Sequence, residues 1–197
     1  MKEQIIDSLV EIGAVKFGAF KLKSGIISPI YLDLRIIISY PDILRRIADE
    51  LKSICQQLQF DRIAGIPYTA LPIATALSLA ADYPMVYCRK ERKKYGTGQI
   101  IEGVWNKGDQ VLLIDDLITN GDSKLETFNI FIESGLTVKD VIVLIDREQG
   151  GRERLRAEGY NLHSAISIFE ILERMKHLKQ IGEIQYNEIF EFLQNNG

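Results

Sequence analysis

Short apolar runs of four or five residues alternate along this chain with longer segments whose apolar residues recur at helical spacing. Strands are predicted at Arg62–Ile66, Met85–Cys88, Gln110–Ile114 and Val141–Ile145. Between them, Ala70–Ala81 and Lys124–Ser134 are predicted to be helices. Strands that alternate with helices form right-handed crossovers, which predicts an α/β fold with a mostly parallel twisted sheet flanked by helices. Ligands bind such sheets beyond the carboxyl ends of the strands, so we expect function in the residues that follow each strand.

Smaller elements are predicted before and after this core. They are an amphipathic helix in residues 1–13, strands at Val15–Phe20 and Ile26–Leu34, and helices at Pro41–Leu58, Ser164–Met175 and Ile184–Leu193. A length of 197 residues suits one domain with a small appended subdomain. We therefore expect residues 1–197 to form a single domain.

The composition argues against several classes of protein. A net charge of −3 disfavours a nucleic-acid partner, because binding to a phosphate backbone needs a clear basic excess. Charges interrupt the apolar residues of the N-terminal stretch, so we expect neither a signal peptide nor a membrane span. Neither G-x-G-x-x-G nor the P-loop pattern occurs, which disfavours a dinucleotide-binding or P-loop enzyme. We expect a soluble, cytoplasmic protein.

The cysteines and histidines predict no metal site. Cys55 and Cys88 lack the spacing of metal or redox sites, and as structural thiols they suit a reducing cytosol. His163 and His177 have no partners at metal-ligand spacing, so we interpret them as structural or surface residues.

The segment from Val111 to Ser123, VLLIDDLITNGDS, is the most informative in the chain. Its four apolar residues predict a buried strand, and Asp115 and Asp116 follow at the carboxyl end. Two acids can bind sugar hydroxyls or lie near a bridging cation, and ribose with Mg²⁺ meets both needs. The alternative is a polar strand-to-helix turn with two solvated acids.

The loop after the two acids predicts a site for a monophosphate. Ser123 and Glu126 match the S-x-x-E capping box, which predicts that a helix begins where this loop ends. Backbone N–H groups at a helix N-terminus, together with the hydroxyls of Thr119 and Ser123, form a cradle suited to phosphate.

The whole pattern resembles a known motif. Four hydrophobic residues, two acids, two hydrophobic residues, Thr, one further residue, Gly, any residue and Ser are similar to the phosphoribosyl pyrophosphate (PRPP) motif of type I phosphoribosyltransferases. The resemblance covers residues from about 15 to about 170. It implies the type I phosphoribosyltransferase fold, with ribose hydroxyls on the two aspartates and the 5′-phosphate in a loop made of Thr119, Asn120, Gly121, Asp122 and Ser123.

Two residues of that loop differ from the family pattern. Asn120 stands where the family usually has a small hydroxyl residue or Ala, and Asp122 adds a negative charge near the expected phosphate. A carboxylate that points into the pocket would weaken phosphate binding, whereas one that points to solvent would change little.

Other loops resemble the orotate phosphoribosyltransferases in particular. The segment Phe20–Arg35, FKLKSGIISPIYLDLR, is similar to their N-terminal signature, which implies that Lys23 reaches the site and binds orotate. The resemblance also implies that residues 1–40 and the C-terminal helices form a small hood or cover. The loop Gly65–Pro72, GIPYTALP, is similar to the one that contacts pyrophosphate, with Tyr68 and Thr69 at its tip.

Two positions resemble the form that is fused in eukaryotic UMP synthase. Thr69 stands where many bacterial relatives carry Lys, and DREQGG at Asp146–Gly151 also matches the fused form. The resemblance implies that Arg147, with Thr119, binds the orotate carboxylate. An arginine fork suits a planar carboxylate, which a neutral base would not need.

The segment Arg89–Trp105 begins with five cations and one Glu at positions 89 to 94. By resemblance, residues 89–98 form a lid that closes over the neighbouring subunit's site in a homodimer. Arg89, Lys90 and Lys93 would contact pyrophosphate, and Tyr95 stands where bacterial enzymes often have His. A solvated charged face is the alternative for this basic run.

The resemblance implies transfer of the 5-phosphoribosyl group from PRPP to orotate, giving orotidine 5′-monophosphate and pyrophosphate in UMP biosynthesis. Catalytic roles are implied for Lys23, Lys93, Asp115 and Asp116. Mg²⁺ would be carried by PRPP near the two aspartates, with no direct protein ligand. The alternatives are transfer to another base and a non-catalytic PRPP-sensing regulator, which would not need Lys23, Arg147 and a basic lid together.

Overall fold

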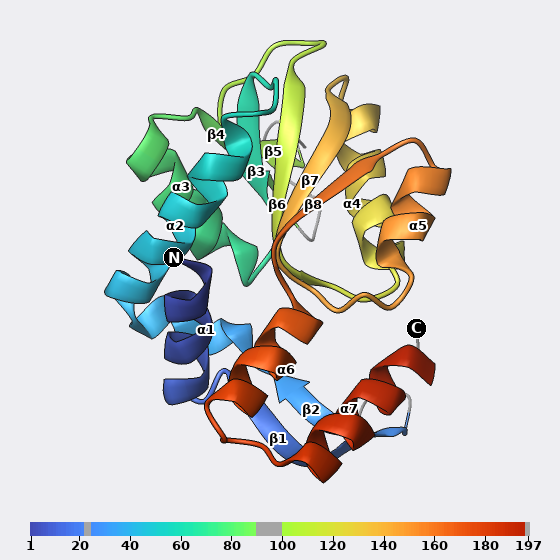
Figure 1. The fold of residues 1–197 in the computed structure, drawn as a ribbon. Helices are drawn as coiled ribbons and strands as arrows, with labels where there is room; N and C mark the ends of the chain where they lie inside the picture. Colours follow the sequence, from blue (N-terminus) through green and yellow to red (C-terminus); the bar gives the residue numbers. More distant parts are fainter. Residues whose placement is uncertain (22–24, 90–99, 196–197) are drawn as a thin grey trace.

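The computed structural model describes residues 1–21, 25–89 and 100–195 of the chain. Its centre is a six-stranded sheet with the order β5-β4-β3-β6-β7-β8 (Figure 1). The strands are β3 (Arg62–Gly65), β4 (Met85–Cys88), β5 (Ile101–Glu102), β6 (Gln110–Ile118), β7 (Thr137–Asp146) and β8 (Asn161–Ser167). All neighbouring pairs are parallel except β4 and β5, which are antiparallel. The predicted α/β fold with a mostly parallel sheet is confirmed.

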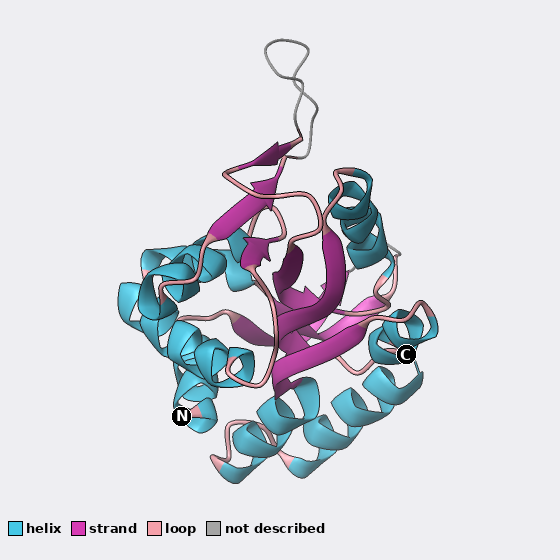
Figure 2. Cartoon of the chain, turned by 90° about the horizontal axis from the view of Figure 1, so that it is seen from above, coloured by secondary structure: helices cyan, strands magenta, loops and turns pink. Residues whose placement is uncertain are grey.

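Helices cover both faces of this sheet (Figures 1 and 2). One face packs against α2 (Pro41–Cys55) and α3 (Ala70–Ala81), and the other against α4 (Asp122–Glu133) and α5 (Gly151–Ala157). Successive residues of β6 therefore enter different cores. Leu112 and Ile114 join the core with α2 and α3, whereas Val111 and Leu113 join the core with Phe128 of α4. Burial on both faces explains why the central strands are uniformly apolar.

The end of β3 is held closely against α3. A Cβ atom added to Gly65 would lie 2.9 Å from the carbonyl oxygen of Ala70 and 3.0 Å from the Cβ atom of Ala74. The small residues at the start of the helix thus allow it to pack directly on the strand. The helix takes the chain away from the sheet directly after the loop 66–69.

The remaining elements form a smaller group at the end of the sheet where β8 finishes (Figure 1). They are α1 (Lys2–Glu11), the antiparallel pair β1 (Val15–Lys21) and β2 (Ile27–Leu32), the 3₁₀-helix η1 (Leu34–Ser39), α6 (Ile168–His177) and α7 (Glu183–Asn195). Helix α6 directly follows β8, and α7 contacts β2. A role for this group as a hood over a bound base stays a prediction.

The structure corrects the helix predicted to begin at Ser164. Residues Asn161–Ser167 form β8, and its buried residues Leu162, Ala165 and Ile166 lie in the sheet beside β7. The helix starts only at Ile168, where a capping box closes the first turn: Phe169 N donates to Ser167 Oγ, and Ser167 N donates to Glu170. Tertiary pairing with β7 thus prevails over the helical pattern.

The structure also corrects the predicted end of β6 and the predicted capping box. Strand β6 continues to Ile118, so Asp115 and Asp116 lie within the strand rather than after it. Helix α4 begins at Asp122, and Ser123 is already helical, with no side-chain capping bond. No helix in the described part of the chain is both long and apolar enough to cross a bilayer.

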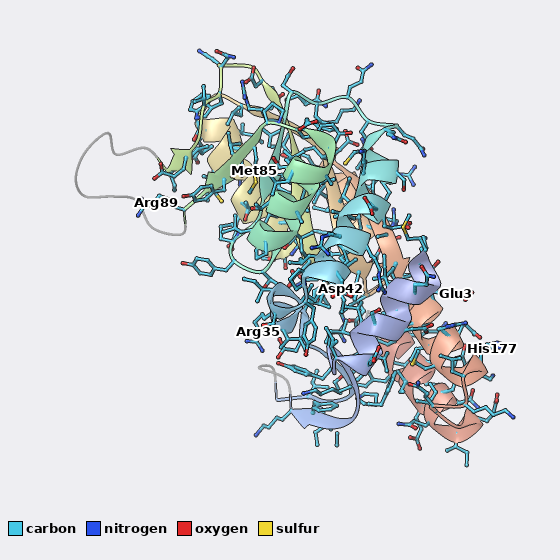
Figure 3. All side chains as sticks on the ribbon, turned by 90° about the vertical axis from the view of Figure 1, so that its left-hand side faces the viewer. Glu3, Arg35, Asp42, Met85, Arg89 and His177 are labelled. Carbon is cyan, nitrogen blue, oxygen red and sulfur yellow. The ribbon has the colours of Figure 1, made fainter. Side chains whose placement is uncertain are left out.

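Arg174 of α6 links the two ends of the chain, and we predict that it stabilises the smaller group of elements. Its guanidinium binds Glu3 at 2.8 Å and Asp7 at 2.6 and 2.9 Å (Glu3 is labelled in Figure 3). These hydrogen bonds lower the pKa of Asp7 below its ordinary value. The stabilisation is therefore complete above the unfolded-state pKa of Asp7 and is lost as the pH falls through the lowered folded-state pKa.

Replacing Arg174 with Met should reduce the free energy of unfolding measurably but modestly at neutral pH, because both acids are exposed enough for solvent to screen the pairs. Urea denaturation followed by circular dichroism measures this loss. The difference from the wild type should shrink in acid, whereas the exposed Arg156→Met should change stability little at either pH. A loss for Arg174→Met that is independent of pH would show that the pair with Asp7 contributes nothing.

Candidate active site

A cavity of about 400 Å³ lies where β3 ends and β6 continues. The parallel pairing of these strands extends as far as Gly65 and Ile114, and Ile66 N donates the next hydrogen bond to Ile114 O at 2.9 Å. The chain then turns into α3, while β6 runs on alongside β7 to Ile118. Six of the residues proposed from the sequence line this cavity: Tyr68, Thr69, Arg89, Asp115, Asp116 and Ser123.

The two aspartates have different surroundings. Asp115 is only 4% exposed, and its Oδ1 accepts a hydrogen bond of 2.8 Å from Asp116 N, while its Oδ2 pairs with Lys124 Nζ. Burial raises the pKa of Asp115 to about 7; the positive charge of Lys124 opposes this rise and the negative charge of Asp116 adds to it. Asp116 is half-buried, and its Oδ1 accepts from Leu117 N at 2.9 Å. Of the two aspartates, Asp116 is therefore the more accessible.

Arg89 follows β4 at the edge of the cavity (Figure 3). Its backbone N donates to Ile100 O at 2.9 Å, and its Nη1 donates to Glu102 Oε1 of β5 at 3.0 Å. Both side chains of this ion pair are about one-third exposed, so a polyanion could compete for the guanidinium. Lys90, Lys93 and Tyr95, which the sequence places in the lid 89–98, and Lys23 lie outside the described residues.

The loop between β6 and α4 turns at Gly121, whose φ of 86° is accessible to glycine at little cost. Of the predicted phosphate loop, only Ser123 lines the cavity; Thr119, Asn120, Gly121 and Asp122 do not. Asp122 is held outside it. Its Oδ2 accepts from Asn120 Nδ2 at 2.9 Å, and its Oδ1 lies 3.5 Å from Arg154 Nε of α5.

The carboxylate of Asp122 is thus 64% exposed and balanced by a cation. Of the two orientations considered from the sequence, the structure shows the one that points away from the pocket. Asn120, the other unusual residue of the loop, supplies one of the hydrogen bonds that keep it there.

The loop after β7 lies directly beside this one. Arg147 N donates to Ile118 O at 3.1 Å, and a Cβ atom added to Gly151 would lie 2.5 Å from Thr119 O. Only glycine therefore lets α5 begin so close to the loop after β6. Asp146 fixes the turn, since it accepts from Glu148 N at 2.8 Å and from Arg152 Nη2 at 3.1 Å.

Arg147 carries an unmatched donor. Its Nε is buried and has no hydrogen-bond partner among the residues that the structure describes, and burial lowers the pKa of its guanidinium. Buried polar groups are nearly always paired in native proteins, so this donor is available to a water molecule or to a ligand. Among ligands, a guanidinium favours an anion.

The sequence patterns did not reveal several residues of this region. Lys124 was predicted only as the start of a helix, yet it lines the cavity and pairs with Asp115. Arg152 and Arg154 belong to α5, which no pattern predicted, and they pair with Asp146 and Asp122. The available sequence signal for these contacts was that acidic and basic residues alternate around each loop. Which acid pairs with which base depends on the register of β6 and β7, which the sequence does not show.

Comparisons with known proteins place the chain among its relatives. No family model matches it. It is 42% identical over 194 residues to uridine 5′-monophosphate synthase of Bos taurus, which covers 98% of this chain and 40% of that protein. It is 39% identical over 175 residues to orotate phosphoribosyltransferase of Pyrococcus abyssi, which covers 88% of this chain and 96% of that protein.

Solved structures give the same result. The UMP synthase of Leishmania donovani matches with a TM-score of 0.90 at 37% identity, over 98% of this chain and 42% of that chain. Orotate phosphoribosyltransferase from Aeropyrum pernix matches with a TM-score of 0.78 at 32% identity, over 90% of this chain and 99% of that chain.

The chain spans about two fifths of the length of the UMP synthases that it matches. It spans 96% of the length of two Pyrococcus orotate phosphoribosyltransferases and 99% of the Aeropyrum pernix structure. The structural matches confirm the predicted phosphoribosyltransferase fold. With 39% and 40% identity to two Pyrococcus proteins that are each covered over 96% of their length, the chain belongs to the orotate phosphoribosyltransferase family.

Proposed function

We propose that this protein transfers the 5-phosphoribosyl group of PRPP to orotate and releases pyrophosphate. One observation carries the proposal: a single cavity brings together residues that follow β3 and β4 with the acids of β6. The adjacent loop after β7 supplies a buried guanidinium with an unmatched donor. Relatives named orotate phosphoribosyltransferase support the same activity.

Each part of PRPP has a proposed binding place among these acids and loops. Ribose hydroxyls would bind Asp115 and Asp116, and the diphosphate would lie near Tyr68, Thr69 and Arg89. The 5′-phosphate would bind the turn 119–123 at the N-terminus of α4, where backbone N–H groups and the helix dipole favour an anion. The outward orientation of Asp122 supports this placement, because its charge is balanced by Arg154.

Orotate would bind between the hood and the loop after β7. The guanidinium of Arg147 offers two parallel N–H groups to the orotate carboxylate, with Thr119 and Lys23 as further contacts. A base without a carboxylate would leave the Arg147 donors unpaired, which disfavours uracil and the purines. Arg147 thus accounts for the choice of orotate over another base.

In the reaction, N1 of orotate forms a bond to C1′ of the ribose as the bond from C1′ to pyrophosphate breaks, and the N1 proton is released. Positive charge develops on the sugar and negative charge on the leaving group. The two aspartates would stabilise the first, and Arg89, Lys90, Lys93 and Tyr95 the second. Closure of the lid over the site would exclude water that could otherwise hydrolyse the ribosyl centre.

Mg²⁺ is proposed to arrive with PRPP, and we assign it no protein ligand. The described residues contain no group of three or more His, Cys, Asp or Glu that could hold a metal ion. The oxygen-rich, acidic wall formed by Asp115 and Asp116 suits a hard cation bound to the diphosphate and sugar oxygens. When bound, the ion would neutralise part of the charge on the leaving group.

We also propose a homodimer in which the lid of one subunit reaches the site of the other. A second hollow of about 470 Å³, lined by Ile38, Leu44 and Pro72, shares Tyr68 and Thr69 with the active-site cavity. Ile38 and Tyr68, which both line this hollow, are 60% and 67% exposed, and exposed apolar residues gathered around one hollow suit a subunit contact. The side that carries α2 and α3 faces the viewer in Figure 3.

We propose a cytoplasmic location because both cysteines of the chain are free thiols. Cys55 and Cys88 are free and buried, and burial raises the pKa of both, that of Cys55 to about 12. Unreactive free thiols suit a reducing compartment.

The first test is a panel of bases. Pyrophosphate release should be rapid with PRPP and orotate and negligible with uracil, adenine or hypoxanthine.

Replacing Arg147 with Met should lower kcat/KM for orotate about 100-fold or more, because a buried charge pair loses one partner. Calorimetry should show nearly unchanged PRPP binding, and Arg156→Met serves as the control for an exposed arginine. Turnover of orotate by Arg147→Met at the wild-type rate would refute the role of Arg147, and binding of PRPP without any turnover would indicate a regulator.

The second test concerns the lid. Replacing Lys93 with Met should lower kcat by roughly 100-fold to 1000-fold while the affinity for PRPP changes little, because the lysine is proposed to act on charge that develops in the transition state. Single-turnover kinetics and calorimetry measure the two effects. The exposed Lys139→Met is the matched control. Equal losses of orotate and PRPP affinity with normal turnover would contradict the assignment.

A further inference from the structure

Lys124 is the one lysine or arginine in the described part of the chain that is buried as a whole residue, whereas Arg147 is only partly buried. It lies in the first turn of α4, where its backbone N donates to Gly121 O at 3.0 Å. Its side chain is 10% exposed, lines the active-site cavity and pairs with Asp115, whose side chain is 5% exposed. The proposed function gives this lysine no task.

Stability alone does not account for such a pair. Removing two charges from water costs several kcal/mol for each ion, and apolar residues of similar volume are often as stable or more stable. The pair also lies beside a cavity rather than in the apolar core, where a bound ligand can meet it. A role in the site is therefore the better explanation.

The geometry shows what Lys124 does to Asp115. The carboxylate is held at both oxygens, by Asp116 N at Oδ1 and by Lys124 at Oδ2, so its plane is fixed. Asp116, the next residue, places a second negative charge beside it. The other ionisable residues that line the cavity are Tyr68, Cys88, Arg89 and Glu126, and Arg89 pairs with Glu102.

We infer that Lys124 is a positioning residue of the sugar site, which keeps Asp115 ionised and fixed in orientation so that PRPP meets a prearranged acid beside the more accessible Asp116. This inference rests on the proposed function and deepens it. It assigns Lys124 to the ribose end of the substrate, whereas the other proposed cations act on the diphosphate or on orotate.

A dependence on pH follows from the same contacts. Burial already raises the pKa of Asp115 to about 7 with Lys124 in place. A cation in contact favours the carboxylate, so its removal raises the pKa of Asp115 further. The neutral acid would then persist at pH values at which the wild type is ionised, and sugar binding would weaken there. Raising the pH should restore it.

The test compares Lys124→Met, Lys124→Gln and Lys124→Arg with the wild type and with the exposed control Lys139→Met. kcat/KM for PRPP is measured as a function of pH. In Lys124→Met and Lys124→Gln the acid limb should move up by about one pH unit or more, giving about tenfold lower kcat/KM on that limb. At high pH the values should approach that of the wild type. Lys124→Arg, which keeps the charge, should follow the wild type more closely.

A second measurement does not depend on turnover. The carboxyl ¹³C signal of Asp115, identified by its absence in Asp115→Asn, is titrated in each variant. Its midpoint should rise in Lys124→Met and Lys124→Gln and stay near the wild-type value in Lys139→Met. Lys124→Gln keeps a hydrogen-bond donor without the charge, so it remains informative if Lys124→Met fails to fold.

The outcomes are distinct. A loss of kcat/KM that is the same at every pH, with an unchanged Asp115 titration, would show that Lys124 is merely structural and would overturn the inference. An unchanged pH profile in both neutral variants would overturn it as well. If the wild type shows no transfer to orotate, the proposed function fails, and the Asp115 titration still decides whether Lys124 controls that acid.

Discussion

The early end of β3 is the constraint on which the site depends. Gly65 lies so close to α3 that any side chain there would meet the backbone of Ala70, and the chain leaves the sheet at once. Strand β6 runs on for four residues beyond its last pairing with β3, at Ile114, while it stays paired with β7. Asp115 and Asp116 therefore reach the cavity that lies where β3 has left the sheet. The acids are thereby placed by backbone pairing and helix packing, which makes their position rigid.

The long pairing between β6 and β7 adds the second half of the arrangement. It continues to Ile118 and Asp146, so the loops that follow the two strands are forced to lie side by side. Gly151 lets α5 begin against Thr119, and the buried Asp146 fixes the turn that carries Arg147. The loops proposed to bind the sugar phosphate and the anionic base are thus adjacent because β6 and β7 end at the same level.

The sequence predicts those parts that local pattern controls. Helix α3 and strand β4 have the predicted bounds, because small residues and the flanking turns define them locally. It does not predict β8, since its pattern mixes buried residues with His163 and Ser164 and only pairing with β7 makes it a strand. Nor does it predict the pair of Lys124 with Asp115, because that contact depends on how far β6 continues. The four lid and hood residues Lys23, Lys90, Lys93 and Tyr95 lie outside the described residues, so their roles stay predictions.

The charged residues of the candidate site differ in whether a bound substrate would have to displace an existing partner. Arg89 is paired with Glu102, so a diphosphate in the cavity would compete for a guanidinium that already has a partner. Arg147 differs, because its buried Nε has no partner to lose among the described residues. In the proposed complex an orotate carboxylate would gain its hydrogen bond without breaking another, whereas the diphosphate would replace the ion pair of Arg89 with Glu102. The proposed base site would thus be preorganised, and the rearrangement of charge would fall at the diphosphate, where the proposed reaction develops negative charge.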